Sequence, residues 1–184
     1  MANTAANVSV GKPKIAGGIY RAPLGTTLPT DAITALAAAY VSMGYIAEGG
    51  VTNANSAETD NYRAWGGDVV LNYQTAKDDT FAFGLLETTN TDVQKAVYGD
   101  DNVEGTMTTG ITVKANAQDA EEAVWVVDMR LRGGVSKRIV IPRGKITEVG
   151  DIVYEDEAAI QYPVTITAMA DAEGNSHYEY MTNS

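Results

Sequence analysis

The sequence predicts a mainly β fold, an antiparallel β-sandwich or barrel with one short flanking α-helix over about residues 89–98. Three observations lead to this prediction. From residue 102 onward apolar and polar residues alternate, and turn signals recur at roughly ten-residue spacing. Only one stretch, near residue 93, combines a helical period with capping residues. The 184 residues, 45% hydrophobic and 20% charged, suffice for a single domain over residues 1–184 with a buried core.

The N-terminal part begins with small and polar residues, so we expect residues 1–13 to form a flexible arm. Residues 14–22 are expected to form the first strand. A rigid elbow then follows, because Pro23 and Pro29 fix φ and lack an N–H, while Gly25 between them can adopt positive φ. The chain therefore leaves a sheet at this point.

After the elbow the sequence predicts a short helical turn over residues 31–36. The side-chain oxygens of Thr30 or Asp31 can cap such a turn by accepting backbone N–H bonds. The second strand is expected over residues 40–46, where apolar and polar residues alternate.

A long projecting hairpin is expected next. Residues 48–63 are polar and show neither a helical nor a strand period, which indicates an irregular loop. Extended structure restarts over residues 65–73, and residues 77–79 are expected to form a turn. We therefore interpret residues 48–63 as the tip of a hairpin that projects from the body.

Two later strands show a two-residue period. Phe81, Phe83 and Leu85 fall on one face of the first. The second has a face for the core and a face that we expect to meet water or a partner. One face of this second strand carries Trp125, Val127, Met129 and Leu131. The other face carries Val126, Asp128, Arg130 and Arg132. Further strands are expected over residues 135–142, 145–154, 159–169 and 176–181, with turns at 133–134, 143–144, 155–157 and 171–174.

The predicted helix lies between these strands. Thr91 and Gln94 have the spacing of a capping box, in which the Gln side chain returns a hydrogen bond to the cap residue. Apolar residues three and four positions apart form a narrow stripe. Gly99 can end the helix in the left-handed conformation.

Several enzyme classes are excluded by composition. The chain has no cysteine, which removes disulfides and thiolate chemistry. His177 is the only histidine, so neither a common zinc site nor a Ser–His triad is expected, and we interpret it as a surface residue on an edge strand. No Walker-type or dinucleotide-binding glycine pattern is present. We therefore expect no enzyme activity and no cofactor.

Two acidic turns, residues 99–104 and 171–175, raise the question of calcium binding. Neither has the ligand spacing of an EF-hand loop, so structural hairpin turns are the favoured interpretation and no metal site is expected. The ten tyrosines and two tryptophans raise a carbohydrate- or ligand-binding platform instead. Trp125 is in register with a core face. For Trp65, packing in the core and contact with another subunit stand as equal alternatives.

The net charge of −11 is shared by both halves of the chain, and no basic stripe emerges. Proteins bind nucleic acid largely through Lys and Arg that neutralise phosphates, so this chain should repel DNA. The N-terminus lacks a signal-peptide pattern, and the uncharged stretch 32–47 is too polar to span a membrane. We expect a soluble protein made in the cytoplasm.

Seven segments carry a family resemblance through their order and spacing. They are YRAPLGTTLPTD at residues 20–31, GYIAEGGV at 44–51, AWGGDVV at 64–70, TFAFGLLETTN at 80–90, YG at 98–99, RIVIP at 138–142 and YPVTITA at 162–168. They are spread over residues 20–168, and the set resembles the major tail tube proteins of long-tailed siphophages of the lambda type.

This resemblance implies a β-sandwich with one flanking helix, of which six copies close into a ring. Rings would stack into a hollow tube in the virion tail, and four strands from each subunit would form its inner barrel. DNA would pass through an acidic or neutral lumen without specific binding. Implied partners are the tape measure protein, the tail terminator and the distal tail or baseplate protein, with assembly in the bacterial host cytoplasm and no membrane. No C-terminal immunoglobulin-like domain is expected.

The resemblance also implies two contact surfaces. The elbow would bind a neighbouring subunit through Tyr20, Pro23, Leu24, Gly25 and Pro29. The projecting loop of residues 48–63 and the strand start beside it would reach the adjacent ring through Val51, Asn53, Asn55, Glu58, Asp60, Tyr62, Arg63 and Trp65.

Two other interpretations share the strand pattern. A monomeric β-sandwich module that binds glycan or protein would account for the aromatic residues. The tube protein of a contractile injection device would be related in fold. Polymerisation separates the first of these from a tail tube subunit, and the neighbouring genes separate the second.

Overall fold

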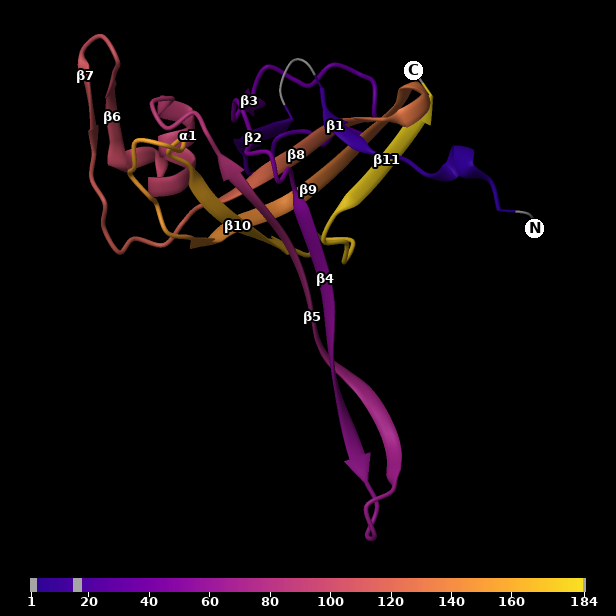
Figure 1. Ribbon diagram of the computed structural model, residues 1–184. Coiled ribbons are helices and arrows are strands. Elements are labelled where there is room, and N and C mark those ends of the chain that lie inside the picture. Colours follow the sequence, from indigo (N-terminus) through magenta and orange to yellow (C-terminus); the bar gives the residue numbers. More distant parts are fainter. Residues whose placement is uncertain (1–2, 15–17, 184) are drawn as a thin grey trace.

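The computed structural model describes residues 3–14 and 18–183 (Figure 1). It confirms a mainly β fold, an antiparallel β-sandwich with one α-helix in the described part. The large sheet contains β1 Gly11–Pro13, β2 Ile19–Pro23, β3 Val41–Ser42, β4 Thr52–Arg63, β5 Val69–Leu85, β8 Glu122–Leu131, β9 Val135–Val149, β10 Tyr162–Met169 and β11 Tyr178–Asn183. A separate pair consists of β6 Val103–Thr106 and β7 Gly110–Val113. The helices are α1 Thr91–Tyr98 and the 3₁₀ turns Ala5–Asn7, Asp100–Asn102 and Arg132–Gly134.

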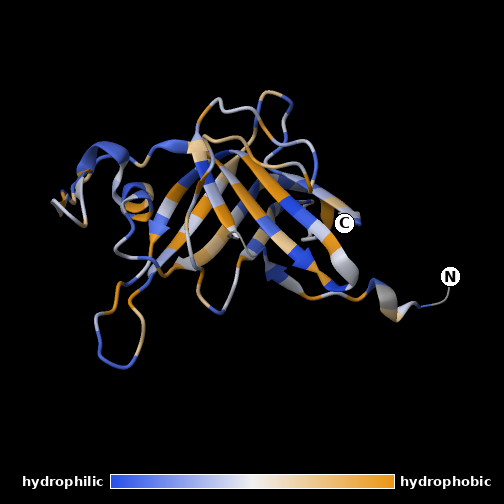
Figure 2. Ribbon diagram, turned by 90° about the horizontal axis from the view of Figure 1, so that it is seen from above, coloured by the Kyte–Doolittle hydropathy of each residue, from blue (hydrophilic) through white to orange (hydrophobic). Residues whose placement is uncertain are grey.

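Strand β9 is the centre of the large sheet. On one side it pairs with β8, which continues to β2 and β3, and the end of β8 also pairs with β1. On its other side β9 pairs with β11 along its first part and with β10 along its last part. The order then runs through β10 and β5 to β4. The sheet therefore branches at β9, and Figure 2 shows its strands curving over one another with hydrophobic and hydrophilic positions alternating.

A glycine lets β9 pass through this region as one strand, so the predicted turn at residues 143–144 is wrong. Gly144 pairs with Ala123 on one side and with Ala168 on the other. A Cβ at Gly144 would lie 2.6 Å from Cδ1 of Trp125, and the Trp125 indole N–H donates to the Gly144 carbonyl at 3.3 Å. The glycine is needed for this close approach, and it does not mark a chain reversal.

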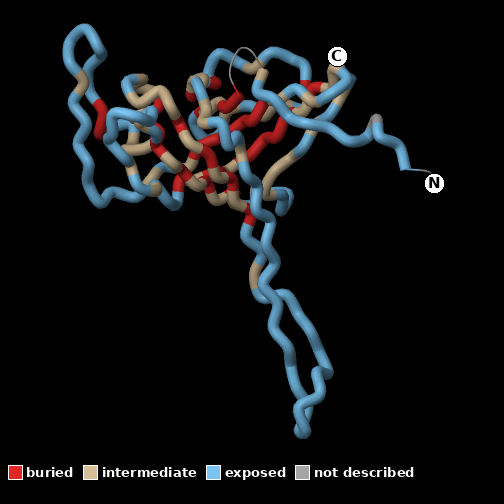
Figure 3. Tube along the Cα trace, in the orientation of Figure 1, coloured by how far each residue is buried: buried red, intermediate tan, exposed pale blue. Residues whose placement is uncertain are grey.

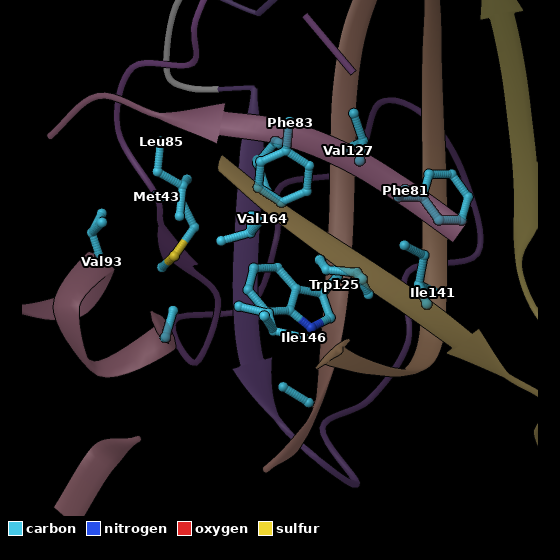
Figure 4. Packing of buried hydrophobic residues seen from close by; sticks show 14 of the residues in the cluster. Met43, Phe81, Phe83, Leu85, Val93, Trp125, Val127, Ile141, Ile146 and Val164 are labelled. Atoms are coloured by element: carbon cyan, nitrogen blue, oxygen red, sulfur yellow. The ribbon is translucent and has the colours of Figure 1, made fainter. Parts of the chain in front are cut away.

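The main core lies between the two branches and is capped by α1. Figure 4 shows Trp125 from β8 among Phe83, Val164 and Ile146, while Phe81 and Ile141 lie beside it. The predicted core face of β5 is confirmed, since Phe81, Phe83 and Leu85 are all buried. The other members of this cluster are Ile19, Met43, Val93, Ala96, Ala123, Val127, Ile139, Tyr162, Ile166 and Ala168.

The second face of β8 was predicted to meet water or a partner, and this prediction is wrong for its first half. Val124 and Val126 are buried in a second cluster with Val140 of β9. The segment between β2 and β3 covers this cluster, with Tyr40 buried and Leu28 packed against it. A strand covered on both faces carries apolar residues on both, which explains the run AVWVV.

The helix begins one residue earlier than a Thr91 cap would place it. The side chain of Asn90 accepts a hydrogen bond from the Asp92 N–H at 3.0 Å, so Asn90 is the N-cap. Gln94 donates to the Thr88 carbonyl at 2.9 Å and does not complete a capping box. Gly99 follows the helix with φ 97° and ψ 144°, a conformation outside the left-handed helical region that was expected.

Residues 48–63 are not an irregular loop. Strand β4 pairs with β5 from Thr52 to Arg63, and β5 runs through the predicted turn at residues 77–79 without a break. The chain reverses at residues 64–68, where the Ala64 N–H donates to the Asp68 carbonyl at 2.8 Å. Figure 3 shows this hairpin leaving the body, exposed along nearly its whole length. With water on both faces, an apolar–polar alternation has no reason to exist, so the sequence showed no strand period.

Several strand limits differ from the predicted ones. The arm is shorter than residues 1–13, because Gly11–Pro13 form β1 on β8. The predicted strand 14–22 is observed as β2, with residues 15–17 outside the described part. The strand over 40–46 shrinks to β3 plus a bridge between Ile46 and Leu85. β9 ends at residue 149, and β10 and β11 begin at residues 162 and 178.

Candidate assembly surfaces

The hairpin β4–β5 is the most prominent surface of the molecule. All twelve residues of β4 are exposed, as are most of the first ten residues of β5. The hairpin projects away from the end of the body that carries β2, β3 and the intervening loops (Figure 1). A two-stranded ribbon with no apolar face buried adds little to the stability of its own chain, so its length needs a reason other than folding.

Seven of the eight residues expected in the projecting loop and the strand start beside it lie on this hairpin, and Val51 lies at its base. Val51 precedes β4 and packs against the main core. Asn53, Asn55 and Glu58 follow along the first part of β4, and Asp60, Tyr62 and Arg63 along its last part. Trp65 lies in the turn.

Trp65 is the largest exposed apolar side chain of the turn. Its side chain is fully solvent-accessible, with a relative accessibility of 107%, so the alternative in which it fills the core is wrong. Arg63 donates to the Gly67 carbonyl at 2.8 Å, which closes the turn around it. Gly66 and Gly67 have φ values of 118° and 98°. These values favour glycine, and they permit a turn that presents the indole outward.

The apolar first part of β5 was not among the surface residues predicted from the sequence. Four apolar or aromatic residues of β5 are exposed, namely Val69, Val70, Leu71 and Tyr73. Tyr62 on β4 is also exposed and pairs with Leu71. The run VVL at residues 69–71 was the sequence signal for this apolar segment, but the same run is equally typical of a buried strand. Exposed apolar side chains gathered along one strand are typical of a contact with another protein.

The elbow is held to its own sheet by a buried ion pair. Arg138 of β9 donates to both carboxylate oxygens of Asp128 on β8, at 2.6 and 2.8 Å. The same guanidinium donates to the carbonyls of Asp31 and Thr34 at 3.0 Å each. Lys14 adds a bond to Asp128 at 3.1 Å. Hydrogen bonding to Asp128 raises the pKa of Arg138 further, so this cation is fixed under the elbow.

Asp31 caps the bend after the elbow, as the sequence predicted for Thr30 or Asp31. Its carboxylate accepts from the N–H groups of Ile33 and Thr34 and from the Thr34 hydroxyl. The Thr34 hydroxyl bond and the backbone bonds lower the pKa of Asp31 to about 2. The expected helical turn is wrong, because residues 31–34 form bends that carry no helix.

The elbow residues expected to contact a neighbour divide into two groups. Tyr20 and Pro29 are half-buried on the chain's own body. Pro23, Leu24 and Gly25 are exposed, and Gly25 has φ 87° at the corner itself. The corner therefore carries the most accessible of the five residues.

A groove of about 530 Å³ runs beside this corner. Its apolar wall includes Pro23, Leu24 and Val41, and its polar wall includes Asp92 and Glu121. Leu24 is 50% exposed and Val41 40%, so the apolar wall of the groove is open to solvent.

His177 is not a surface residue on an edge strand. It lies just before β11, half-buried, and its Nδ1 contacts the carboxylate of Asp79 on β5. Ser176 donates to the same Asp79 oxygen at 2.7 Å. A catalytic triad requires the serine to donate to the histidine. Here both side chains meet one carboxylate, so the three residues form a structural cluster.

The two acidic turns are occupied by bonds within the chain. Asp171 accepts from the N–H groups of Glu173 and Asn175 and from the Tyr178 hydroxyl. Asp100 pairs with Arg21 at 2.7 Å. Within residues 3–14 and 18–183, no group of three or more His, Asp or Glu side chains is arranged to hold a metal ion.

Many basic side chains are neutralised within the fold. Seven of the 13 Lys and Arg residues form ion pairs with carboxylates in the described part. They are Lys14, Arg21, Lys114, Lys137, Arg138, Arg143 and Lys145. The remaining surface is strongly acidic, which opposes phosphate binding.

The long exposed hairpin and the exposed elbow corner define an antiparallel β protein with apolar side chains on projecting surfaces. A protein-family model for the phage tail tube protein matches residues 3–184, and the chain belongs to this family. It is a structural subunit of a bacteriophage tail tube and not an enzyme, and it self-assembles into a tube in the virion tail. No curated protein matched the chain.

The described part of the chain contains one α-helix and three 3₁₀ turns. None of them is both long enough and apolar enough to cross a membrane.

Proposed function

We propose that six copies of this chain close into a ring and that the rings stack into the hollow tail tube of a long-tailed siphophage. DNA passes through the tube during genome delivery. The family supports the tube, and the finer architecture is the one that the sequence resemblance implies. The observation that carries the proposal is the β4–β5 hairpin, which is exposed along its length and ends in a solvent-exposed Trp65.

The hairpin suits a contact between rings because it leaves the body on the side away from β2, β3 and the elbow (Figure 1). Copies stacked in one direction would bring the hairpin of one ring to the opposite end of the next. Such a head-to-tail contact joins two different surfaces of the same chain and generates an open filament when it repeats.

Ring closure would use strand edges. β4 and β3 lie at the two ends of the main strand order, and β11 pairs only with β9 among the described strands. Free edges invite pairing with another chain, and a closed ring of sheets removes them. This supports a subunit whose sheet is continued by its neighbours.

The charge balance supports passage of DNA. A channel wall that formed many phosphate contacts would hold the genome, whereas the acidic surface of this chain would let it slide. By family resemblance the tube would also meet the tape measure protein, the tail terminator and the distal tail or baseplate protein. Assembly would take place in the host cytoplasm.

Sedimentation velocity over a wide concentration range tests the proposal. We expect a monomer or small oligomer at low concentration and large polymers above a threshold, because a repeated head-to-tail contact has no closed end state. A protein that stays monomeric throughout would instead favour the monomeric glycan- or protein-binding module.

The elbow corner gives a mutational prediction. Replacing Pro23 with Gly and Leu24 with Ser should raise the polymerisation threshold while lowering the free energy of unfolding by less than about 1 kcal/mol, since both side chains are exposed. Leu28→Ser is the matched control, because Leu28 packs on the chain's own second cluster. Leu28→Ser should lower the free energy of unfolding more than the Pro23 and Leu24 replacements do. Equal losses of stability in the two variants would show that the corner only packs on its own core.

A further inference from the structure

The cluster around Asp79 lies where the hairpin leaves the body. β5 pairs with β10 up to Thr80, which lies opposite Thr167. Beyond Thr80, β5 has only β4 beside it. Asp79 is therefore the first residue of β5 past the supported sheet, and it is only 3% exposed although its neighbour Asp78 is exposed.

Both carboxylate oxygens of Asp79 are occupied. Asn53 on β4 donates to Oδ1 at 2.7 Å and also to the Thr80 carbonyl at 3.0 Å. Ser176 donates to Oδ2 at 2.7 Å, and His177 contacts the same oxygen through Nδ1. One side chain thus joins both strands of the hairpin to the segment that leads into β11.

The aromatic ring of His177 adds a second contact. It meets Phe81 of β5 edge to face, with ring centroids 5.4 Å apart. Phe81 belongs to the main core and is fully buried. The imidazole is therefore wedged between the core end of β5 and the carboxylate at the hairpin base.

The Asp79 carboxylate is suited to accepting these hydrogen bonds. Burial acts to raise the pKa of Asp79, but the hydrogen bonds from Ser176, Asn53 and His177 and the histidine charge outweigh burial and leave the pKa below its ordinary value. Asp79 is ionised at neutral pH, and its bonds are of the stronger, charge-assisted kind.

We propose that Asp79, Asn53, Ser176 and His177 form a latch that fixes the direction of the β4–β5 hairpin relative to the body and ties it to the edge strand β11. An unsupported two-stranded ribbon twists and bends easily at its base. The latch restricts this bending of the hairpin before the chain contacts another copy. Its assembly role rests on the proposed function, because a hairpin held in one direction loses less freedom on docking to the next ring.

The latch can be tested on the unassembled protein by measuring distances between two spin labels. The chain has no native cysteine, so Thr59→Cys on the hairpin and Glu148→Cys on β9 give two unique attachment sites, both exposed. The unsubstituted latch should give one narrow distance distribution. His177→Ala and Asp79→Asn should broaden it, because the ratio of latched to free hairpin falls by about 10- to 100-fold on losing bonds to a charged group.

Two variants separate a latch from general damage. His177→Asn keeps a donor at the position of Nδ1 and should restore most of the narrow distribution. Asp78→Asn changes the exposed neighbouring carboxylate and should leave the distribution unchanged. Far-UV circular dichroism should be the same for all variants, because the sheet does not depend on the hairpin beyond Thr80.

The polymerisation threshold of the same variants, without labels, completes the test. Broadened distances together with a higher threshold support the proposal. A distribution that stays narrow in both His177→Ala and Asp79→Asn overturns the latch, and broadened distances with an unchanged threshold overturn its role in assembly. If the unsubstituted protein formed no polymer, the proposed function would fail, while the distance measurement would still decide whether the latch exists.

Discussion

Arg138→Ala is expected to lower the free energy of unfolding by about 3–5 kcal/mol, because it leaves a buried carboxylate without its main partner. Arg138 and Asp128 are 2% and 3% exposed. Without the guanidinium, Asp128 keeps Lys14 at 3.1 Å, and the carbonyls of Asp31 and Thr34 lose their shared donor. Urea denaturation should show a lower midpoint with an unchanged slope.

The control for this prediction is Arg132→Ala, which removes an exposed arginine close by in sequence and should change stability by no more than about 0.5 kcal/mol. The double variant Arg138→Met with Asp128→Leu should recover part of the loss, since it leaves no buried carboxylate, while the carbonyls of Asp31 and Thr34 still lack their donor. A loss below about 1 kcal/mol for Arg138→Ala would mean that water or Lys14 compensates Asp128, and that the pair does not hold the elbow.

Shortening the hairpin is expected to abolish polymerisation and to leave the fold intact. Residues 57–77 are replaced by Asn-Gly, which joins the cross-strand pair Ser56 and Asp78 through a two-residue turn. The removed segment is almost entirely exposed, and the Asp79 cluster is retained. Far-UV circular dichroism should still show a β protein, with the strand signal lowered only by the removed pairs, and the urea midpoint should match the full chain. Sedimentation should show no large polymer at any concentration.

Met107→Ser provides a matched control for the hairpin. Met107 is an exposed apolar residue of the second projecting pair, between β6 and β7. It should leave polymerisation unchanged, whereas Trp65→Ser should weaken it. Normal tubes from the shortened chain would show that the hairpin does not join rings.

The sequence predicted the parts of the fold in which one face is buried. Phe81, Phe83 and Leu85 alternate because the core lies on one side of β5 only, and their register follows directly from the pattern. The same reasoning failed along residues 52–78, where the strands have water on both sides. Polar residues with no period then look like a loop, although backbone pairing alone holds the ladder.

Long-range contacts account for the other errors. The face of β8 that carries Asp128 was predicted to meet water or a partner, because the sequence does not show that Arg138 of β9 pairs with Asp128 beneath the elbow. Likewise His177 gave no local sign of its partner, which lies 98 residues away in the chain. The sequence named the segments of the two candidate surfaces, but which elbow residues face outward depends on the packing of Leu28 and Tyr40.

The central claim is that this chain builds a DNA-conducting tube from stacked rings. Electron cryomicroscopy of polymers grown from concentrated protein tests it most directly. We expect six subunits per ring, the β4–β5 hairpin crossing to the next ring with Trp65 buried there, and a channel wall that is acidic or neutral. A filament with another subunit number, a hairpin left in solvent, or a channel lined by unpaired Arg and Lys would contradict the account.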